Sequence, residues 1–257
     1  MRKYWVIWWR TALASIQSSL VHRWGAGFFL AGKLLRFGLF IVFLRTLHQQ
    51  FNQLAGYDFD QLLTFFLMFN WFDLVGQILF RGIYWFRDKV VSGEFDFYLA
   101  KPANSLFQVL TGHTDILDLP LLVIVMVMLG RQGAHLSAEQ WLLWGVISGA
   151  GLVFILAVHI LVAALGILTT EVDHTMMIYR DVAQMARWPI DIYTDNIRAL
   201  LTFVIPITLA FSLPAKAWLG LTSWTTAIWA VGGAGIVLGL GLKLWRYALT
   251  QYVSASS

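Results

Sequence analysis

Long apolar runs separated by short charged segments dominate the chain. Six runs reach or approach the roughly 20 residues that a helix needs to cross a bilayer. They do not alternate apolar and polar residues as the strands of a membrane barrel do, and a helix pairs its own backbone groups in lipid. The pattern predicts an all-α integral membrane protein with one domain, 1–257, and about six transmembrane helices at 25–47, 62–81, 115–130, 141–168, 199–213 and 224–244.

The first segment, 1–22, differs from these runs because its apolar residues occupy one helical face. Trp5, Trp8, Trp9 and Ala12 share that face, and Lys3 lies opposite. Such a helix suits the headgroup region of a membrane. We expect an interfacial amphipathic helix here; the alternative is that the segment is simply the start of the first span.

Basic residues set the expected orientation, because Lys and Arg are retained on the cytoplasmic side. With the N-terminus inside, only Arg45, Arg131 and Lys216 fall in outer segments. The chain is therefore predicted to be N-in and C-in. Its two largest connections, 82–114 and 169–198, are then cytoplasmic loops.

Composition supports a lipid environment and excludes several kinds of chemistry. Charged residues make up 12% of the chain, against about 25% in soluble domains. With no cysteine, disulfides and thiolate sites are excluded. No Walker, HExxH, GxSxG or EF-hand pattern occurs, so we expect no catalytic site, no nucleotide cofactor and no nucleic-acid partner.

Two short polar clusters have spacings that can hold a metal. One is GHTDILD, with His113, Asp115 and Asp118; the other is TEVDH, with Glu171, Asp173 and His174. Both lie at predicted membrane boundaries, where solvated polar residues are common. We therefore predict no metal site.

Ionisable and polar residues inside the spans are more informative, because their desolvation is costly. Lys33 and Arg36 lie one turn apart on the first span, as do Asn70 and Asp73 on the second, with His159 at a similar depth on the fourth. Pairing of Asp73 with Arg36 or Lys33 would neutralise both charges. These residues either line a translocation path or form inter-helix bridges, and the sequence leaves both readings open.

Proline marks the fifth run. Pro206 interrupts it, where a proline removes one backbone hydrogen bond and kinks a helix, and Pro214 is expected to mark a break near the external face. A kinked span followed by a short re-entrant turn can serve as an external gate. Prolines in membrane helices can equally be tolerated without a role.

Two strings carry a family resemblance. VVSGEFDFYLAKPANSLF follows the second span, and ARWPIDIYTDNIRALLTFVIPITLAFSLPAKAWLG covers the fifth. In order and spacing they resemble a bacterial family of type-2 ATP-binding-cassette exporter permeases, over essentially the whole chain. The resemblance implies an inner-membrane half-transporter: a second, identical or related permease chain and a separate ATPase that binds ATP and Mg.

The same resemblance, more than the pattern itself, implies that the loop 82–114 couples the spans to that ATPase. Gly93 permits a tight turn and Pro102 starts or stops a helix. Apolar residues such as Phe95 stand among charges and are expected to contact the partner; the alternative is a helix packed against lipid headgroups. The expected coupling residues are Gly93, Glu94, Phe95, Asp96, Leu99 and Pro102.

Other function classes remain open at this stage. An ion- or proton-coupled carrier would use Asp73 as its titrating group, and an intramembrane enzyme or a membrane anchor of a larger assembly needs no transport path. The substrate of an exporter, which could be a drug, peptide, lipid or polymer, is not indicated by the sequence.

Overall fold

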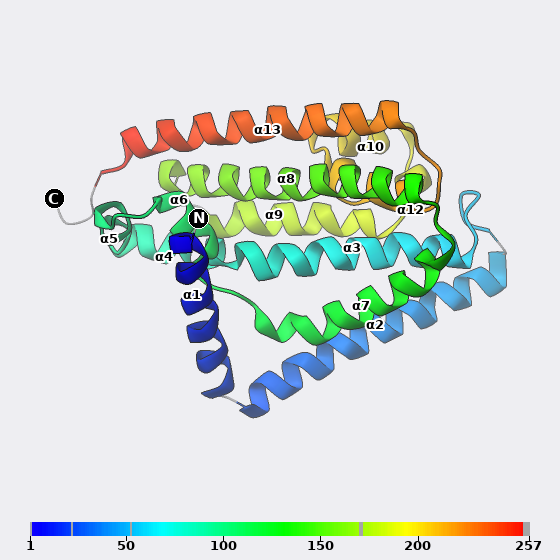
Figure 1. The fold of residues 1–257 in the computed structure, drawn as a ribbon, viewed down its shortest axis with the longest axis horizontal. Coiled ribbons are helices and arrows are strands. Elements are labelled where there is room, and N and C mark those ends of the chain that lie inside the picture. Colours follow the sequence, from blue (N-terminus) through cyan, green and yellow to red (C-terminus); the bar gives the residue numbers. More distant parts are fainter. Residues whose placement is uncertain (1, 22, 52, 170–171, 254–257) are drawn as a thin grey trace.

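The computed structural model describes residues 2–21, 23–51, 53–169 and 172–253. Within these ranges the chain is helical and contains no strand. Figure 1 shows long helices lying side by side, with short helices gathered at both ends of the bundle. The long helices are α2 (Arg23–Phe51), α3 (Phe59–Phe80), α7 (Leu119–Gln132), α8 (Ala138–Thr169), α9 (Val172–Gln184) and α13 (Trp224–Gln251).

Short elements define the two ends of the bundle. One, the α5 end, carries η1 (Arg81–Trp85), α4 (Phe86–Val91), α5 (Phe95–Ala100) and α6 (Ser105–Thr111). The other, the α12 end, carries the α2–α3 loop, α10 (Asp195–Ala199), η6 (Leu200–Val204), α11 (Ile207–Ala210) and α12 (Ser212–Trp218). The remaining short elements are η2 (Ile116–Asp118), η3 (Gly133–His135), η4 (Met185–Arg187) and η5 (Ile190–Ile192).

Five helical stretches of the described chain are long and apolar enough to cross a membrane. They are Arg23–Phe51, Phe59–Val91, Ile116–His135, Ala138–Thr169 and Trp224–Gln251. At 1.5 Å per residue, the shortest, of 20 residues, already spans about 30 Å. The prediction of an all-α integral membrane protein is confirmed, and five of the predicted spans lie within these helices.

The segment 172–191 corrects the predicted topology. Met176 of α9 packs at the α5 end, in the apolar cluster that contains Trp245. Past η4, the carboxylate of Asp191 accepts a hydrogen bond of 2.7 Å from the Tyr57 hydroxyl in the α2–α3 loop, at the α12 end. A loop confined to one side of the membrane cannot contact both ends of the bundle. The prediction that all of 169–198 is a cytoplasmic loop is therefore wrong, because α9 packs along α8 and the segment 172–191 reaches both ends of the bundle (Figure 1).

The predicted fifth span, 199–213, is also misplaced. The helices Asp195–Val204 and Ile207–Trp218 meet at an angle of 75°. Asp191, just before this pair, lies 2.7 Å from Lys216 near its end, and Trp218 packs on Trp141 at the start of α8. Both ends of the pair therefore lie at the α12 end, so it is a re-entrant hairpin. The segment 172–191, whose helix α9 has 13 residues, is not among the five candidate spans, but it is the sixth segment of the described chain that joins the two ends of the bundle.

Helix α1 (Arg2–Val21) runs steeply across the direction of the long helices, at the α5 end (Figure 1). Tyr4 packs edge-on against Phe107 of α6 with ring centroids 4.9 Å apart. Trp5 and Trp9 are 64% and 51% exposed. This orientation suits the predicted interfacial helix, for which the membrane surface itself remains a prediction.

Candidate functional site

Polar residues from four crossings meet inside the bundle. Arg36 of α2, Asp73 of α3, His159 of α8 and Arg180 of α9, with Arg187 of η4, line a small cavity of about 50 Å³. Arg36, Asp73 and His159 were singled out by sequence. Arg180 and Arg187 were missed because they were assigned to a cytoplasmic loop, although the spacing of apolar residues in 172–184 is that of an amphipathic helix.

A wider groove of about 430 Å³ adjoins this cavity. The two share Arg36, Asp73, Gln77 and Arg180 as lining residues. The groove lies between α2, α3 and the start of α7, and it also contains the predicted polar residues Lys33 and Asn70. All five intramembrane residues predicted from the sequence thus line one of two connected spaces, the full groove lining being Phe28, Phe29, Gly32, Lys33, Arg36, Asn70, Asp73, Leu74, Gln77, Arg81, Asp118, Leu121 and Arg180.

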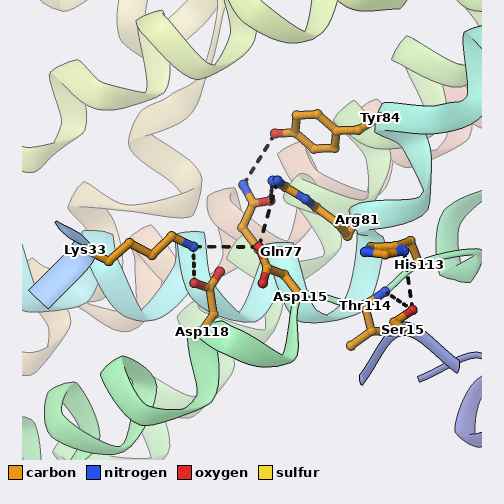
Figure 2. A network of polar contacts seen from close by, with 9 residues as sticks. All are labelled: Ser15, Lys33, Gln77, Arg81, Tyr84, His113, Thr114, Asp115 and Asp118. Carbon is orange, nitrogen blue, oxygen red and sulfur yellow. Dashed lines mark hydrogen bonds and ion pairs between the residues drawn. The ribbon is translucent and has the colours of Figure 1, made fainter. Parts of the chain in front are cut away.

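Lys33 does not pair with Asp73. Figure 2 shows its ammonium group reaching Asp118, to which it donates a hydrogen bond, and Asp115, at 3.7 Å. The Asp118 side chain is 1% exposed and that of Lys33 is 18% exposed. This bridge joins α2 to η2. Of the two roles that the sequence left open, Lys33 therefore has that of an inter-helix bridge, but with Asp118 and Asp115 in place of Asp73.

Asp115 extends the network to the α5 end. Its carboxylate lies 3.8 Å from Arg81, whose guanidinium donates to Gln77 and lies over the Tyr84 ring at 4.3 Å (Figure 2). The two carboxylates of the GHTDILD cluster are therefore engaged by cations. The other proposed cluster, Glu171, Asp173 and His174, lies outside the residues whose side chains the structure describes.

The loop before η2 is tied to α1 on its other side. Ser15 contacts the Nδ1 atom of His113 at 3.4 Å and accepts a hydrogen bond from the Thr114 amide (Figure 2). Burial lowers the pKa of His113, the positive charge of Arg81 lowers it further, and Asp115 opposes both. The imidazole is therefore neutral at pH 7, and the loop is linked to α1, α2 and η1 through polar contacts.

Three of the intramembrane charges keep no close partner of opposite sign. No ion pair within 4.0 Å involves Arg36, Asp73 or Arg180 in the described part of the chain. Arg187 lies over the Phe69 ring at 5.1 Å. His159 bonds the Ile155 carbonyl at 2.8 Å within its own helix. Free cations therefore line the cavity, while Lys33 and Arg81 are neutralised.

At the α5 end, the structure changes the set of residues that a partner can contact. Phe95 is 0% exposed and packs against Phe86 and Trp245, so the prediction that it faces a partner is wrong. Phe97 and Leu99, in contrast, are 67% and 43% exposed. An aromatic residue beside charges can pack inward as well as outward, and the sequence did not distinguish these cases.

The other predicted coupling residues surround this helix. Gly93 adopts a φ of +77°, which provides the expected tight turn. Glu94 lies 3.7 Å from Lys89, Asp96 is partly exposed, and the exposed Pro102 accepts a hydrogen bond from Lys3 of α1 through its carbonyl. The geometry therefore places α5 on a turn, braced by α1.

The predicted prolines lie in the re-entrant hairpin. Pro206 separates η6 from α11 at the 75° bend. Pro214 sits in the first turn of α12, just after the interruption at Phe211 between α11 and α12, where a missing amide hydrogen costs little. The hairpin is held by Asp191, which binds both Tyr57 and Lys216.

Electrostatics strengthens the contact of Asp191 with Tyr57 and Lys216. Burial alone would raise the pKa of Asp191, but hydrogen bonds from Lys216 and Tyr57 and the charges of Lys216 and Arg198 lower it below its ordinary value. Burial and the bond to Asp191 raise the pKa of Tyr57. Asp191 is therefore ionised at neutral pH and fastens the α2–α3 loop to α12.

Comparison with known proteins gives one match. The family of ABC-2 family transporter proteins matches residues 34–256. No curated protein and no solved structure is significantly similar to the chain. The match covers all crossings except the start of α2, and it agrees with the all-helical membrane bundle described above. The chain is a transmembrane permease subunit that belongs to the ABC-2 transporter family.

Proposed function

We propose that the chain is the permease half of an ATP-driven exporter and that a separate ATPase, which holds ATP and Mg, docks on the α5 end. The observation that carries this proposal is the arrangement of α5. Its outer face presents Phe97 and Leu99 to solvent, with Glu94 and Lys101 nearby. An exposed aromatic group among charged residues is the composition of a protein-binding surface.

The inner face of α5 is tightly packed against neighbouring helices, which allows a movement of α5 to reach the spans. Phe95 packs on Trp245 of α13, and Gln108 of α6 donates hydrogen bonds to the carbonyls of Tyr98 and Ala103. Gly82 of η1 lies so close to α6 that an added Cβ would stand 2.3 Å from the Val109 carbonyl. A partner that moves α5 would therefore move α3 and α13 with it, as rigid packed elements do.

Charge distribution supports a cytoplasmic location for the α5 end in a bacterial inner membrane. With α9 crossing the bilayer, Arg198 joins Arg45, Arg131 and Lys216 at the α12 end. The α5 end carries more, including Lys3, Lys89, Lys101 and the pair Lys243 and Arg246. Cationic segments are retained inside, which supports a cytoplasmic position for α1, the end of α13 and the proposed ATPase contact. A second permease chain, identical or related, would complete the transporter.

At the outer end, the hairpin α10–α12 would act as the gate. The bend at Pro206 brings the buried Thr208 back toward Leu201. The Thr208 hydroxyl donates a hydrogen bond of 2.9 Å to the Leu201 carbonyl. Only Asp191 fastens the hairpin to the α2–α3 loop by an ion pair and a hydrogen bond in the described contacts. A closure held by few polar contacts suits an element that must open for each export cycle.

A double variant tests the docking proposal. Replacing Phe97→Asp and Leu99→Asp adds charge to exposed positions, so the chain should fold while losing the co-purified ATPase and substrate-stimulated ATP hydrolysis. The matched control is Leu221→Asp, an equally exposed apolar residue at the α12 end (50%), which should retain both. Equal ATPase recovery from the double variant and the control would refute docking at α5. Phe95→Asp is unsuitable, because it would bury a charge and unfold this end.

A further inference from the structure

The groove beside Arg36 contains more positive charge than the protein neutralises. Asp115 and Asp118 are engaged by Lys33 and Arg81. Among the described carboxylates, Asp73 is then the one left to face the guanidinium groups of Arg36, Arg180 and Arg187 in the groove and cavity. Asp181, the neighbour of Arg180, is exposed and lines neither space.

Uncompensated charge inside a membrane is costly, and such residues mark functional paths. The field of an excess of guanidinium groups is much stronger in this low-dielectric setting than in water. Arg forms bidentate, charge-assisted bonds with phosphate and carboxylate groups. The missing counter-charge is therefore best supplied by an anionic ligand.

Size favours the groove over the small cavity as the place of the anionic group. The cavity, at about 50 Å³, has room for only a few water molecules. The groove, at about 430 Å³, falls in the range of small-molecule sites. Arg36 and Arg180 line both spaces, so an anion in the groove would contact them, while Arg187 would contribute its charge from the cavity side.

The walls of the groove next to these cations are apolar and open to the side of the bundle. Phe28 and Phe29, at the α5 half of α2, are 77% and 44% exposed, and Leu74 and Leu121 form the opposite walls. Gly32 lies between them and has no atom within 4 Å of an added Cβ. A molecule with its anionic group on Arg36 can therefore extend an apolar chain along α2 into the bilayer.

We propose that this groove binds an anionic amphiphile, with its charged headgroup on Arg36 and Arg180 and its apolar chain against Phe28 and Phe29. As a cargo assignment, this rests on the exporter function proposed above. The site is formed by the chain alone. The amphiphile enters laterally from the cytoplasmic leaflet, so its headgroup does not cross bulk hydrocarbon before it is bound.

Competition between two lipids tests the binding site. The isolated chain in detergent is mixed with equal amounts of phosphatidylglycerol and phosphatidylcholine that carry the same acyl chains, and retained lipid is measured by native mass spectrometry. The wild-type chain should retain the anionic lipid several-fold more than the zwitterionic one. The double variant Arg36→Gln, Arg180→Gln should abolish that preference and bring the two retained lipids to nearly equal amounts, as expected for losing charge-assisted contacts.

Two further variants keep the test independent of folding defects. Asp73→Asn removes the carboxylate and should raise the preference for the anionic lipid about threefold, a gain that an unfolded chain cannot show. Gly32→Leu should obstruct the groove and lower retention of the lipid. Gly27→Leu is its matched control, since Gly27 lies on the same helix with equally open surroundings and does not line the groove.

Soluble glycerol phosphate distinguishes an amphiphile from a free phosphate. It should fail to displace phosphatidylglycerol at concentrations that saturate the lipid site. Equal retention of both lipids, no loss in the Arg36→Gln, Arg180→Gln variant, or displacement by glycerol phosphate would each overturn the site. This assay contains no ATPase, so its failure leaves the docking proposal intact, and loss of ATPase binding leaves the lipid preference unchanged.

Cargo is tested on the assembled complex. An anionic lysophospholipid should stimulate ATP hydrolysis by the wild-type complex several-fold over a zwitterionic one, and Gly32→Leu should abolish the difference. Retention of phosphatidylglycerol by the isolated chain without any stimulation in the complex would refute the cargo assignment.

Discussion

The two ends of the bundle are each held by a carboxylate between partners, but at very different burial. In the half nearer the α5 end, the Asp118 carboxylate is 1% exposed and binds Lys33. At the α12 end, the Asp191 side chain is 31% exposed and binds Lys216. Removing one partner of a buried pair leaves an unpaired charge, whereas exposed pairs are screened by solvent. The difference indicates that the α5 end is held rigidly and that the α12 end opens at lower cost, as the proposed coupling and gating require.

The largest effect is expected from Asp118→Ala. It leaves Lys33 next to Asp115 alone, in a site where breaking a buried pair costs about 3–5 kcal/mol. The thermal midpoint of the purified chain in detergent should fall sharply. The double variant Lys33→Met, Asp118→Leu should recover most of the loss, because it removes both charges. A midpoint equal to wild type for Asp118→Ala would show that this bridge does not hold the α5 end.

Two tightly packed glycines allow a matched comparison. An added Cβ at Gly82 would stand 2.3 Å from the Val109 carbonyl and 2.6 Å from the Gly112 amide. At Gly133 it would meet the Trp218 ring at 2.5 Å, which is a side chain and can shift more readily than the backbone atoms beside Gly82. Gly82→Ala should cost about 1–3 kcal/mol, and Gly133→Ala should cost less. The reverse order of thermal midpoints would contradict a rigid α5 end.

Lys216→Met should cost only about 1 kcal/mol, because the pair with Asp191 is partly exposed. It should, however, loosen the hairpin, which hydrogen exchange of residues 200–212 reports as faster exchange while the α5 end is unchanged. Lys216→Arg is the control and should exchange like wild type. Slow exchange in Lys216→Met would mean that apolar packing alone closes the α12 end.

The smallest effect is a pH dependence at Asp191. Its pKa is lower in the folded chain than in the unfolded chain. Its contribution is therefore fully present above the ordinary pKa of Asp, near 4, and is lost as the pH falls through the lower folded value. Hairpin exchange rates corrected for intrinsic pH effects should be constant from pH 5 to 8 and rise only below about pH 4. Asp191→Asn should remove this rise; a rise that persists in that variant would assign it to another group.

Much of the fold could be predicted from apolar runs, and the exceptions have a common cause. Segment 172–191 carries Arg180 and Asp181, so its polarity is typical of a loop, yet one face of it, with Met176 and Ala183, is buried against other helices. Segment 199–213 is apolar and has the pattern of a span, yet it turns back at Pro206. Apolar content reports contact with lipid or core. It does not report whether the chain crosses or returns.

The candidate site was predicted in its residues but not in its pairings. Arg36, Asp73 and His159 meet as expected from their depth. The partner of Lys33 was not predictable, because Asp118 reaches it only through the position of η2 beside α2. Phe95 was assigned to a surface for a similar reason: which face of a six-residue helix is buried depends on α13, far away in the sequence.

Whether the two ends of the bundle lie on opposite sides of the membrane depends on the crossing by α9. Single introduced cysteines test this crossing most directly, since the chain has no cysteine of its own. Asn196→Cys in α10 and Phe97→Cys in α5 are both at exposed positions. A membrane-impermeant maleimide applied to intact cells should label Asn196→Cys, and Phe97→Cys only after permeabilisation. If both positions require permeabilisation, 169–198 is a cytoplasmic loop and the crossing by α9 is contradicted.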